Sequence, residues 1–221
     1  MVFDIRFRTS FNCIVNGPTG SGKTTFVKNL LEIKSLIFDN EPKKVILYYS
    51  IMQNIYTEMK NEGLIDELVQ VDQAFPTYDE IVRRVHPYKD DGGSLLIFDD
   101  MVTQLTADFE KIFLNVSHHE KASVIFMTQN LFYNDKVYRT ISLNSHYIVL
   151  MKSHRDKQQV SILARQICPG NSKYIVGSYE DATKKPYTYL ICDFRPDTPS
   201  AIRVRSSIFS HEIPCVTYLE T

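Results

Sequence analysis

Eight consecutive residues near the amino terminus have the types and the spacing of a phosphate-binding loop: Gly17, Pro18, Thr19, Gly20, Ser21, Gly22, Lys23 and Thr24. The glycines allow the backbone to turn, so that successive N–H groups point inward at phosphate oxygens. Lys23 is expected to reach the β- and γ-phosphates, and the Thr24 hydroxyl to ligate Mg²⁺. Thr25 completes the predicted set of nucleotide contacts. The pattern predicts ATP with Mg²⁺ as the ligand.

Two adjacent acids close an apolar run at residues 95–100. A strand there would deliver Asp99 to the carboxyl edge of a sheet, where it holds Mg²⁺ through water beside Thr24. Asp100 would then stand where a carboxylate polarises the attacking water. Many hydrolases with such a loop have glutamate at this position, and aspartate has a shorter arm. The alternative is a pair of acids that only caps a strand at a turn.

A further apolar run, residues 122–128, ends at Gln129 and Asn130. If this strand lies beside the strand that carries Asp99, the Gln129 amide is close to the γ-phosphate. An amide there donates to the phosphate and accepts from the attacking water, so it senses the state of the nucleotide. A polar strand end exposed to solvent is the alternative.

Two arginines flank a predicted strand at residues 146–151: Arg139 precedes it and Arg155 follows it. Ring-forming ATPases often insert an arginine from a neighbouring subunit, because a guanidinium stabilises the charge of the transferring phosphoryl group. The alternative for each residue is that it is only a surface ion-pair partner. His118 and His119 are interpreted as the polar end of a helix, because adjacent helical residues point in different directions.

Apolar runs of strand length alternate with segments of helical periodicity along the chain. Such strands are typical of a mostly parallel central sheet covered by helices on both faces, so the predicted fold is α/β with three layers. The predicted strands are residues 11–16, 45–49, 68–71, 94–100, 122–128, 146–151, 187–192 and 202–204, and the predicted helices are residues 24–34, 51–60, 77–84, 108–118, 135–141 and 157–167.

The composition sets the number of domains and the compartment. The 221 residues are 43% hydrophobic, so we expect one domain over residues 1–221, with a core at 11–192 and an extension at 193–221 that begins with a linker-like stretch. The four cysteines are far apart, which favours a reducing, intracellular compartment over a metal or disulfide framework, and Cys13 is interpreted as a core residue. No apolar run reaches the length of a membrane span, and a soluble protein is expected.

The net charge of −1 is unevenly spread. Between His146 and Arg205 lie ten lysines and arginines and five acids, so this stretch carries +5 and the remainder −6. A basic C-terminal half suits the phosphate backbone of a nucleic acid. A solvated, lysine-rich surface explains the same charges equally well.

The order of the motifs resembles the FtsK–HerA type of P-loop ATPase: the loop at residues 17–24, the acidic pair after residues 95–98, and Gln129 with Asn130 after the next strand. The run from Arg139 to Arg165 further resembles the poxvirus-type genome-packaging ATPases, including those of Polinton (Maverick) elements and virophages. The resemblance spans residues 11–167, and the run after Gln129 is its discriminating part.

This resemblance implies a RecA/ASCE-like P-loop NTPase fold and a homo-oligomeric ring, a pentamer or hexamer, that uses ATP to drive double-stranded DNA into a preformed capsid. It implies nucleotide roles for the residues already named: Lys23, Thr24, Asp99, Asp100 and Gln129. An arginine supplied in trans is favoured, either Arg139 or Arg155. A capsid or vertex protein is the implied partner, at sites of virion assembly in the host cytoplasm or nucleus, or in the virion.

Two other functions fit a chain of this length. A nucleoside or nucleotide kinase has a similar phosphate-binding loop, but usually adds an arginine-rich lid and an acceptor pocket. A regulatory nucleotide switch would hydrolyse ATP slowly and would not respond to DNA.

Overall fold

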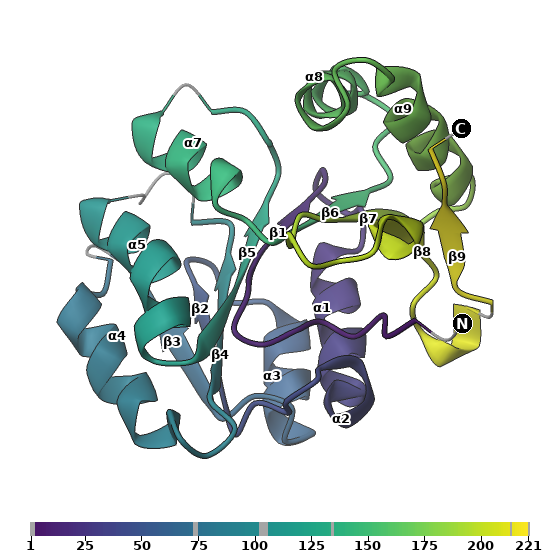
Figure 1. Ribbon diagram of the computed structural model, residues 1–221. Helices are drawn as coiled ribbons and strands as arrows, with labels where there is room; N and C mark the ends of the chain where they lie inside the picture. The colour runs from purple at the N-terminus through teal and green to yellow at the C-terminus, as the bar shows by residue number, and fades with distance from the viewer. Residues whose placement is uncertain (1–2, 73–74, 102–105, 134, 213, 221) are drawn as a thin grey trace.

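The computed structural model describes residues 3–72, 75–101, 106–133, 135–212 and 214–220. Its strands form a nine-stranded sheet in the order β3-β2-β4-β5-β1-β6-β7-β8-β9 (Figure 1). Pairing is parallel from β3 to β6 and antiparallel from β6 to β9. The strands are β1 (Asn12–Asn16), β2 (Lys44–Tyr49), β3 (Glu67–Gln70), β4 (Ser94–Asp99), β5 (Ala122–Thr128), β6 (Tyr147–Met151), β7 (Tyr189–Asp193), β8 (Val204–Ser206) and β9 (Val216–Tyr218).

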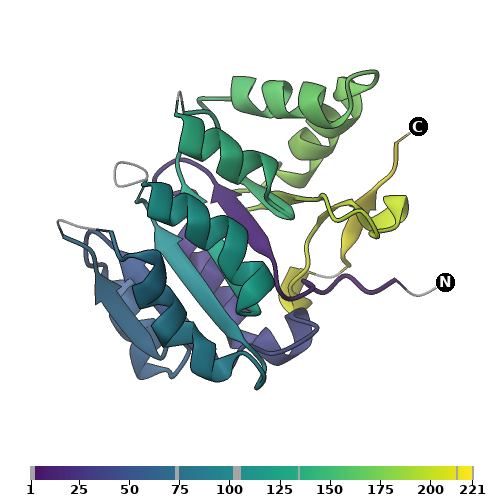
Figure 2. The same cartoon turned by 60° about the vertical axis from the view of Figure 1, so that its left-hand side comes forward.

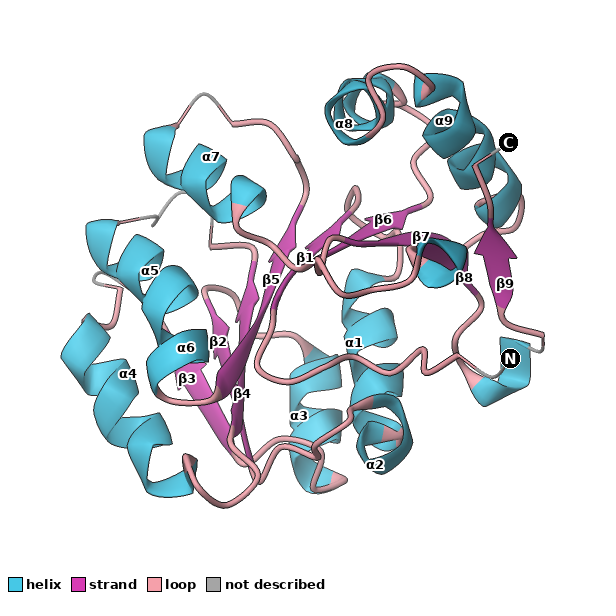
Figure 3. Cartoon of the chain, viewed as in Figure 1, coloured by secondary structure: helices cyan, strands magenta, loops and turns pink. Residues whose placement is uncertain are grey.

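Helices cover both faces of the sheet, which makes three layers (Figures 1 and 3). In the described part of the chain, no helix has both the length and the apolar character needed to cross a bilayer. The helices are α1 (Lys23–Glu32), α2 (Lys34–Ile37), α3 (Asn54–Asn61), α4 (Tyr78–Val85), α5 (Ala107–Lys111), α6 (Ser117–His119), α7 (Lys136–Leu143), α8 (Gln158–Ile167) and α9 (Ser172–Ala182), with a π-helical stretch, Ile112–Val116, between α5 and α6.

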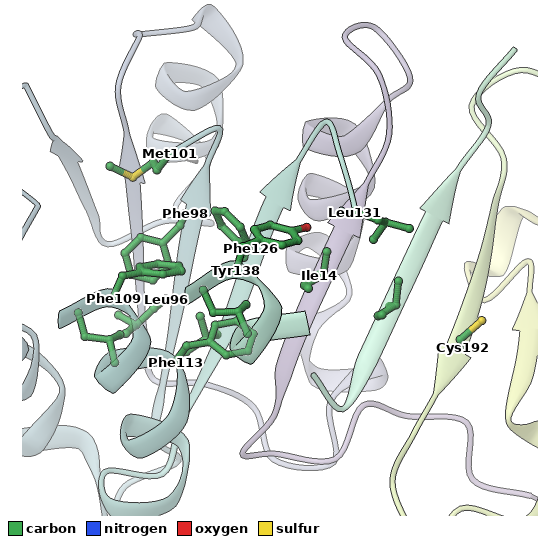
Figure 4. Packing of buried hydrophobic residues seen from close by; sticks show 14 of the residues in the cluster. Ile14, Leu96, Phe98, Met101, Phe109, Phe113, Phe126, Leu131, Tyr138 and Cys192 are labelled. Atoms are coloured by element: carbon green, nitrogen blue, oxygen red, sulfur yellow. The ribbon is translucent and has the colours of Figure 1, made fainter. Parts of the chain in front are cut away.

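Alternating side chains of the strands feed two separate cores, because successive residues of a strand point to opposite faces. In β1, Cys13 and Val15 pack against α1, α2 and α3, whereas Ile14 packs on the other face against the helices from α4 onward. Figure 4 shows part of this second core, where Phe109 of α5 lies beside Phe98 of β4. The turned view in Figure 2 also shows helices on both sides of the sheet.

The predicted α/β fold with a mostly parallel sheet is confirmed, and all eight predicted strands occur within a few residues of their expected bounds. The expected helix at residues 108–118 is interrupted by the π-helical stretch. Neither β9 nor α9 was predicted. The buried face of α9 consists only of Ile175, Ser178 and Tyr179, and the helix contains Gly177. A helix that contains glycine and buries only a narrow apolar face has a weak hydrophobic periodicity, so the sequence pattern does not predict it.

The stretch that composition marked as linker-like, residues 193–199, is held against the sheet. The Asp193 carboxylate accepts from Arg205 Nη1 at 3.1 Å, and both side chains are almost fully buried. Arg205 also donates to the Ile5 carbonyl at 3.3 Å, so this pair fixes the N-terminal segment as well. β8 and β9, which follow, complete the antiparallel edge of the sheet.

Asp193→Ala is expected to lower the free energy of unfolding by about 3–5 kcal/mol, because it leaves the Arg205 guanidinium buried without a carboxylate. Urea unfolding followed by circular dichroism measures this change. The matched control is Asp197→Ala: this carboxylate is 64% exposed and pairs with Arg8, so its loss should cost less than about 1 kcal/mol. Equal effects of the two variants would contradict a structural role for the buried pair.

Candidate active site

The ends of three neighbouring parallel strands meet at one edge of the sheet. β5 lies between β1 and β4, with Asn16 paired to Thr128 and Asp99 to Met127. The Gly17 N–H donates to the Thr128 carbonyl at 3.1 Å, which ties the start of the loop to the end of β5. The carboxyl ends of parallel strands are where open α/β sheets bind ligands.

The loop at residues 17–24 turns from β1 into α1 through backbone that favours glycine. Gly20 and Gly22 have φ angles of 76° and 96°. A Cβ on Gly17 would lie 2.6 Å from the Met151 Cβ, so a larger residue would not fit there. The loop therefore brings its backbone N–H groups and the amino-terminal end of α1 to the same place, an arrangement that attracts anions.

The Lys23 side chain folds over this loop. Its Nζ donates to the carbonyl oxygens of Gly17 at 2.6 Å and Pro18 at 3.2 Å. Burial lowers the pKa of the Lys23 ammonium, while the carboxylates of Asp99 and Asp100 act in the opposite direction. The loop thus holds a partly buried cation at its mouth, and an entering phosphate would supply the anionic partner that two neutral carbonyls do not.

Asp99 is buried at the end of β4, where it is 5% exposed. Its carboxylate accepts from the Tyr56 hydroxyl of α3. Burial raises the pKa of Asp99, and the Tyr56 hydrogen bond and the Lys23 charge lower it. Burial and the same carboxylate raise the pKa of Tyr56, which keeps that hydroxyl a donor. Asp99 and Thr24 line one cleft and offer oxygen ligands, the kind that Mg²⁺ prefers.

Gln129 connects the loop to the second acid. Its Nε2 donates to Asp100 Oδ2 at 2.7 Å, and its Oε1 accepts from the Thr19 hydroxyl at 3.2 Å. Asp100 has a φ of 51°, a left-handed conformation that Asp tolerates better than most residues. Gln129 and Asp100 are both exposed to solvent, yet each is held in position at the cleft.

These groups line a cleft of about 330 Å³, within the range of ligand pockets. The cleft also includes three side chains that the sequence did not single out: Gln53 and Ile55, at the start of α3, and Tyr187. Tyr56, which holds Asp99, lies on the same helix. No local pattern marks these residues, because they approach the loop only through the packing of distant segments.

The two candidate arginines lie outside this cleft. Arg155 lines a neighbouring cavity of about 260 Å³ that also includes Pro18 and Gln129, so it flanks the phosphate-binding loop. Arg139 is exposed on α7 and lines a different cavity. His118 and His119 are exposed at the end of α6, which fits their interpretation as a polar helix end.

The largest cavity described, about 700 Å³, lies away from the loop, between α9 and the antiparallel strands β7 and β8. Its lining includes Cys168, Cys192 and Leu219. None of the phosphate-binding groups faces it, so cavity size alone does not identify the functional site.

Comparison with known protein families shows the family to which the chain belongs. Residues 4–176 match the poxvirus A32 protein family, which is most of the chain. The chain belongs to that family. The predicted resemblance to poxvirus-type packaging ATPases is thereby confirmed, and the kinase alternative is not supported. As an A32-family member, the protein is a nucleotide-binding NTPase.

A curated relative and a solved structure are also similar to this chain. A nucleotide-binding protein of Thermodesulfovibrio yellowstonii is 26% identical over 193 residues, which cover 82% of this chain and 68% of that protein. The genome packaging NTPase B204 of Sulfolobus turreted icosahedral virus 2, solved in complex with ATP-gammaS, has a TM-score of 0.58 and 14% identity. The similarity covers 85% of this chain and 94% of that one, and it confirms the fold.

Proposed function

We propose that this A32-family protein is an ATP-driven motor that moves double-stranded DNA into a viral capsid. The observation that carries the proposal is the bridge that Gln129 forms between Thr19 of the loop and Asp100. One cleft contains the phosphate-binding loop, a carboxylate that is suited to polarise water, and an amide that contacts both. This arrangement couples ATP hydrolysis to the position of a strand end.

Each proposed role follows from the chemistry of the side chain. Lys23 stabilises the β- and γ-phosphates, and Asp100 polarises the attacking water while Gln129 orients it. Thr24 and Asp99 would hold Mg²⁺, Asp99 through water. Mg²⁺ neutralises charge on the phosphate oxygens when it is bound. Tyr56 positions Asp99 by donating to its carboxylate.

The DNA partner is proposed from the basic C-terminal half together with the family. Several cations of this half belong to two loops that contribute residues to the cleft or to the cavity beside it: Lys152 and Arg155 after β6, and Lys185, near Tyr187, before β7. Cations of this kind grip a phosphate backbone without reading its sequence, and their binding weakens as salt rises. A capsid or vertex protein at the sites of virion assembly would complete the motor.

A translocation assay tests the proposal. A triplex-forming strand annealed at one end of a linear duplex is displaced when a motor runs along the duplex. We expect ATP-dependent displacement, and none with a non-hydrolysable analogue. Hydrolysis of ATP without displacement, at salt low enough for DNA binding, would contradict a motor function.

We propose a ring in which Arg139 acts in trans, since it is exposed on α7 and does not face its own cleft. Arg139→Ala and Lys23→Ala subunits should each be inactive alone, and mixing them should restore ATP hydrolysis, because an intact loop then meets an intact Arg139. Arg155 flanks its own loop, so a mixture of Arg155→Ala with Lys23→Ala should recover nothing. Phosphate release measures both mixtures. If ATP hydrolysis recovered in the mixture with Arg155→Ala and not in the mixture with Arg139→Ala, Arg155 would be the arginine that acts in trans.

A further inference from the structure

A second compartment adjoins the nucleotide cleft at Tyr187. This compartment is about 370 Å³, similar in size to the cleft itself. Gly22, Thr25 and Tyr187 line both, so the two adjoin at the start of α1. A ligand held by the loop would therefore reach the second compartment past Thr25.

The reacting groups lie away from this second compartment. Asp99, Asp100 and Gln129 line the cleft but not the compartment, and the γ-phosphate would react beside them. A nucleotide bound in that orientation would extend its nucleoside along α1, beyond Thr25. The second compartment lies on that path, with Asn29, one turn further along the same helix, in its wall.

The floor of the compartment is aromatic. Phe26 of α1 contacts Tyr189 of β7 and Phe209, with ring centroids 4.7 Å and 5.5 Å away. All three rings are buried. An apolar floor beneath a few polar groups is the usual environment of a small-molecule site.

The polar groups come from α1 and from the C-terminal segment. The Glu212 carboxylate accepts from the Tyr189 hydroxyl and, at 3.2 Å, from the Phe209 N–H, which fixes its orientation. The His211 ring stacks on Phe209 at 5.7 Å. The Asn29 amide offers both a donor and an acceptor. These groups suit the edge of a nucleobase, whose ring nitrogens and exocyclic groups both donate and accept.

Tyr187 stands at the boundary with its ring available. It is 69% exposed, and among the described residues no other aromatic ring stacks on it. Its φ of 62° is unusual for a bulky residue, and such conformations gather at functional sites. The adjacent backbone is fixed: Lys152 N–H donates to the Thr188 carbonyl at 3.0 Å and Lys152 Nζ to the Lys184 carbonyl at 2.7 Å.

We propose that this compartment binds the nucleoside end of ATP and that the base stacks on Tyr187. The inference rests on the proposed ATP-binding role of the loop, and it adds the C-terminal segment with Glu212 to the nucleotide site. Stacking on an aromatic side chain contributes about tenfold to the affinity for one base.

The test compares ATP with inorganic tripolyphosphate, which carries the phosphates and lacks the nucleoside. Dissociation constants of both are measured by calorimetry with Mg²⁺ on the full chain. Tyr187→Ala should bind ATP about tenfold more weakly and tripolyphosphate unchanged, and Tyr187→Phe should match the wild type. Tyr187→Asn repeats the loss with a residue that tolerates the left-handed backbone. The matched control is Leu143→Ala, since Leu143 is also 69% exposed but lies on α7.

Three outcomes would overturn the proposal. ATP affinity unchanged in both Tyr187→Ala and Tyr187→Asn means that no base stacks there. Equal weakening of ATP and tripolyphosphate means that the ring only supports the loop. A wild-type chain that binds neither compound refutes the phosphate site and this inference together. The affinity for ATP can depend on Tyr187 even if the chain does not move along DNA. That result would support the stacking inference and contradict only the proposed motor function.

Discussion

Lys23→Ala is expected to reduce ATP turnover by at least about a hundredfold, the scale of losing one pre-organised charge at a reacting centre. Lys23 is the cation at the mouth of the loop, where its Nζ lies within 3.2 Å of two loop carbonyls. No other lysine or arginine lines the cleft in the described part of the chain. Phosphate release at saturating ATP measures the loss.

The variant also removes two hydrogen bonds of the loop, so its fold is checked by thermal unfolding. Lys23→Met keeps most of the aliphatic stem and should be equally inactive. The matched control on the same helix is Lys28→Ala, whose ammonium pairs with Glu62 and does not line the cleft. Turnover retained in a folded Lys23→Ala chain would exclude the proposed phosphate-binding role.

Asp100→Asn is expected to leave ATP binding intact while hydrolysis slows by about 10²–10⁴-fold, the contribution of a positioned general base. Asparagine has nearly the same shape, tolerates the φ of 51°, and still accepts from Gln129 Nε2 through its carbonyl oxygen. The substitution therefore removes the negative charge and leaves the bridge to Thr19. Binding of a fluorescent ATP analogue and single-turnover hydrolysis measure the two quantities separately.

The control for this second variant is Asp91→Asn, an exposed acid in the turn at the opposite end of β4. It should bind and hydrolyse ATP as the wild type does. If Asp100→Asn hydrolyses ATP normally, the water is polarised by another group, and the bridge through Gln129 has a structural role only.

The parts of the site that could be predicted depend on local sequence. The loop at residues 17–24 is one contiguous segment, so its glycines and Lys23 specify it without reference to the rest of the chain. Asp99 ends β4 and Gln129 follows β5, two buried strands that are mostly apolar, and adjacent parallel strands bring such ends together. That inference required β4 and β5 to be neighbours, which the sheet order confirms.

The rest required the tertiary structure. In the sequence, Tyr56 cannot be distinguished from the other core residues of a helix. Only the packing of α3 shows its hydrogen bond to Asp99. Tyr187 lies in a short loop without a pattern, more than 150 residues from the segment it contacts. The Asp193–Arg205 pair lies in a stretch whose composition resembled a linker, because composition does not show which charges become buried together.

In the proposed function, the cleft at the ends of β1, β4 and β5 hydrolyses ATP in order to move DNA. Phosphate release by the wild-type chain, with and without linear double-stranded DNA at low salt, tests it most directly. The expected result is hydrolysis that DNA stimulates, with a stimulation that declines as salt rises and that Lys23→Ala abolishes. A rate of hydrolysis that DNA does not change at any salt concentration would contradict the claim.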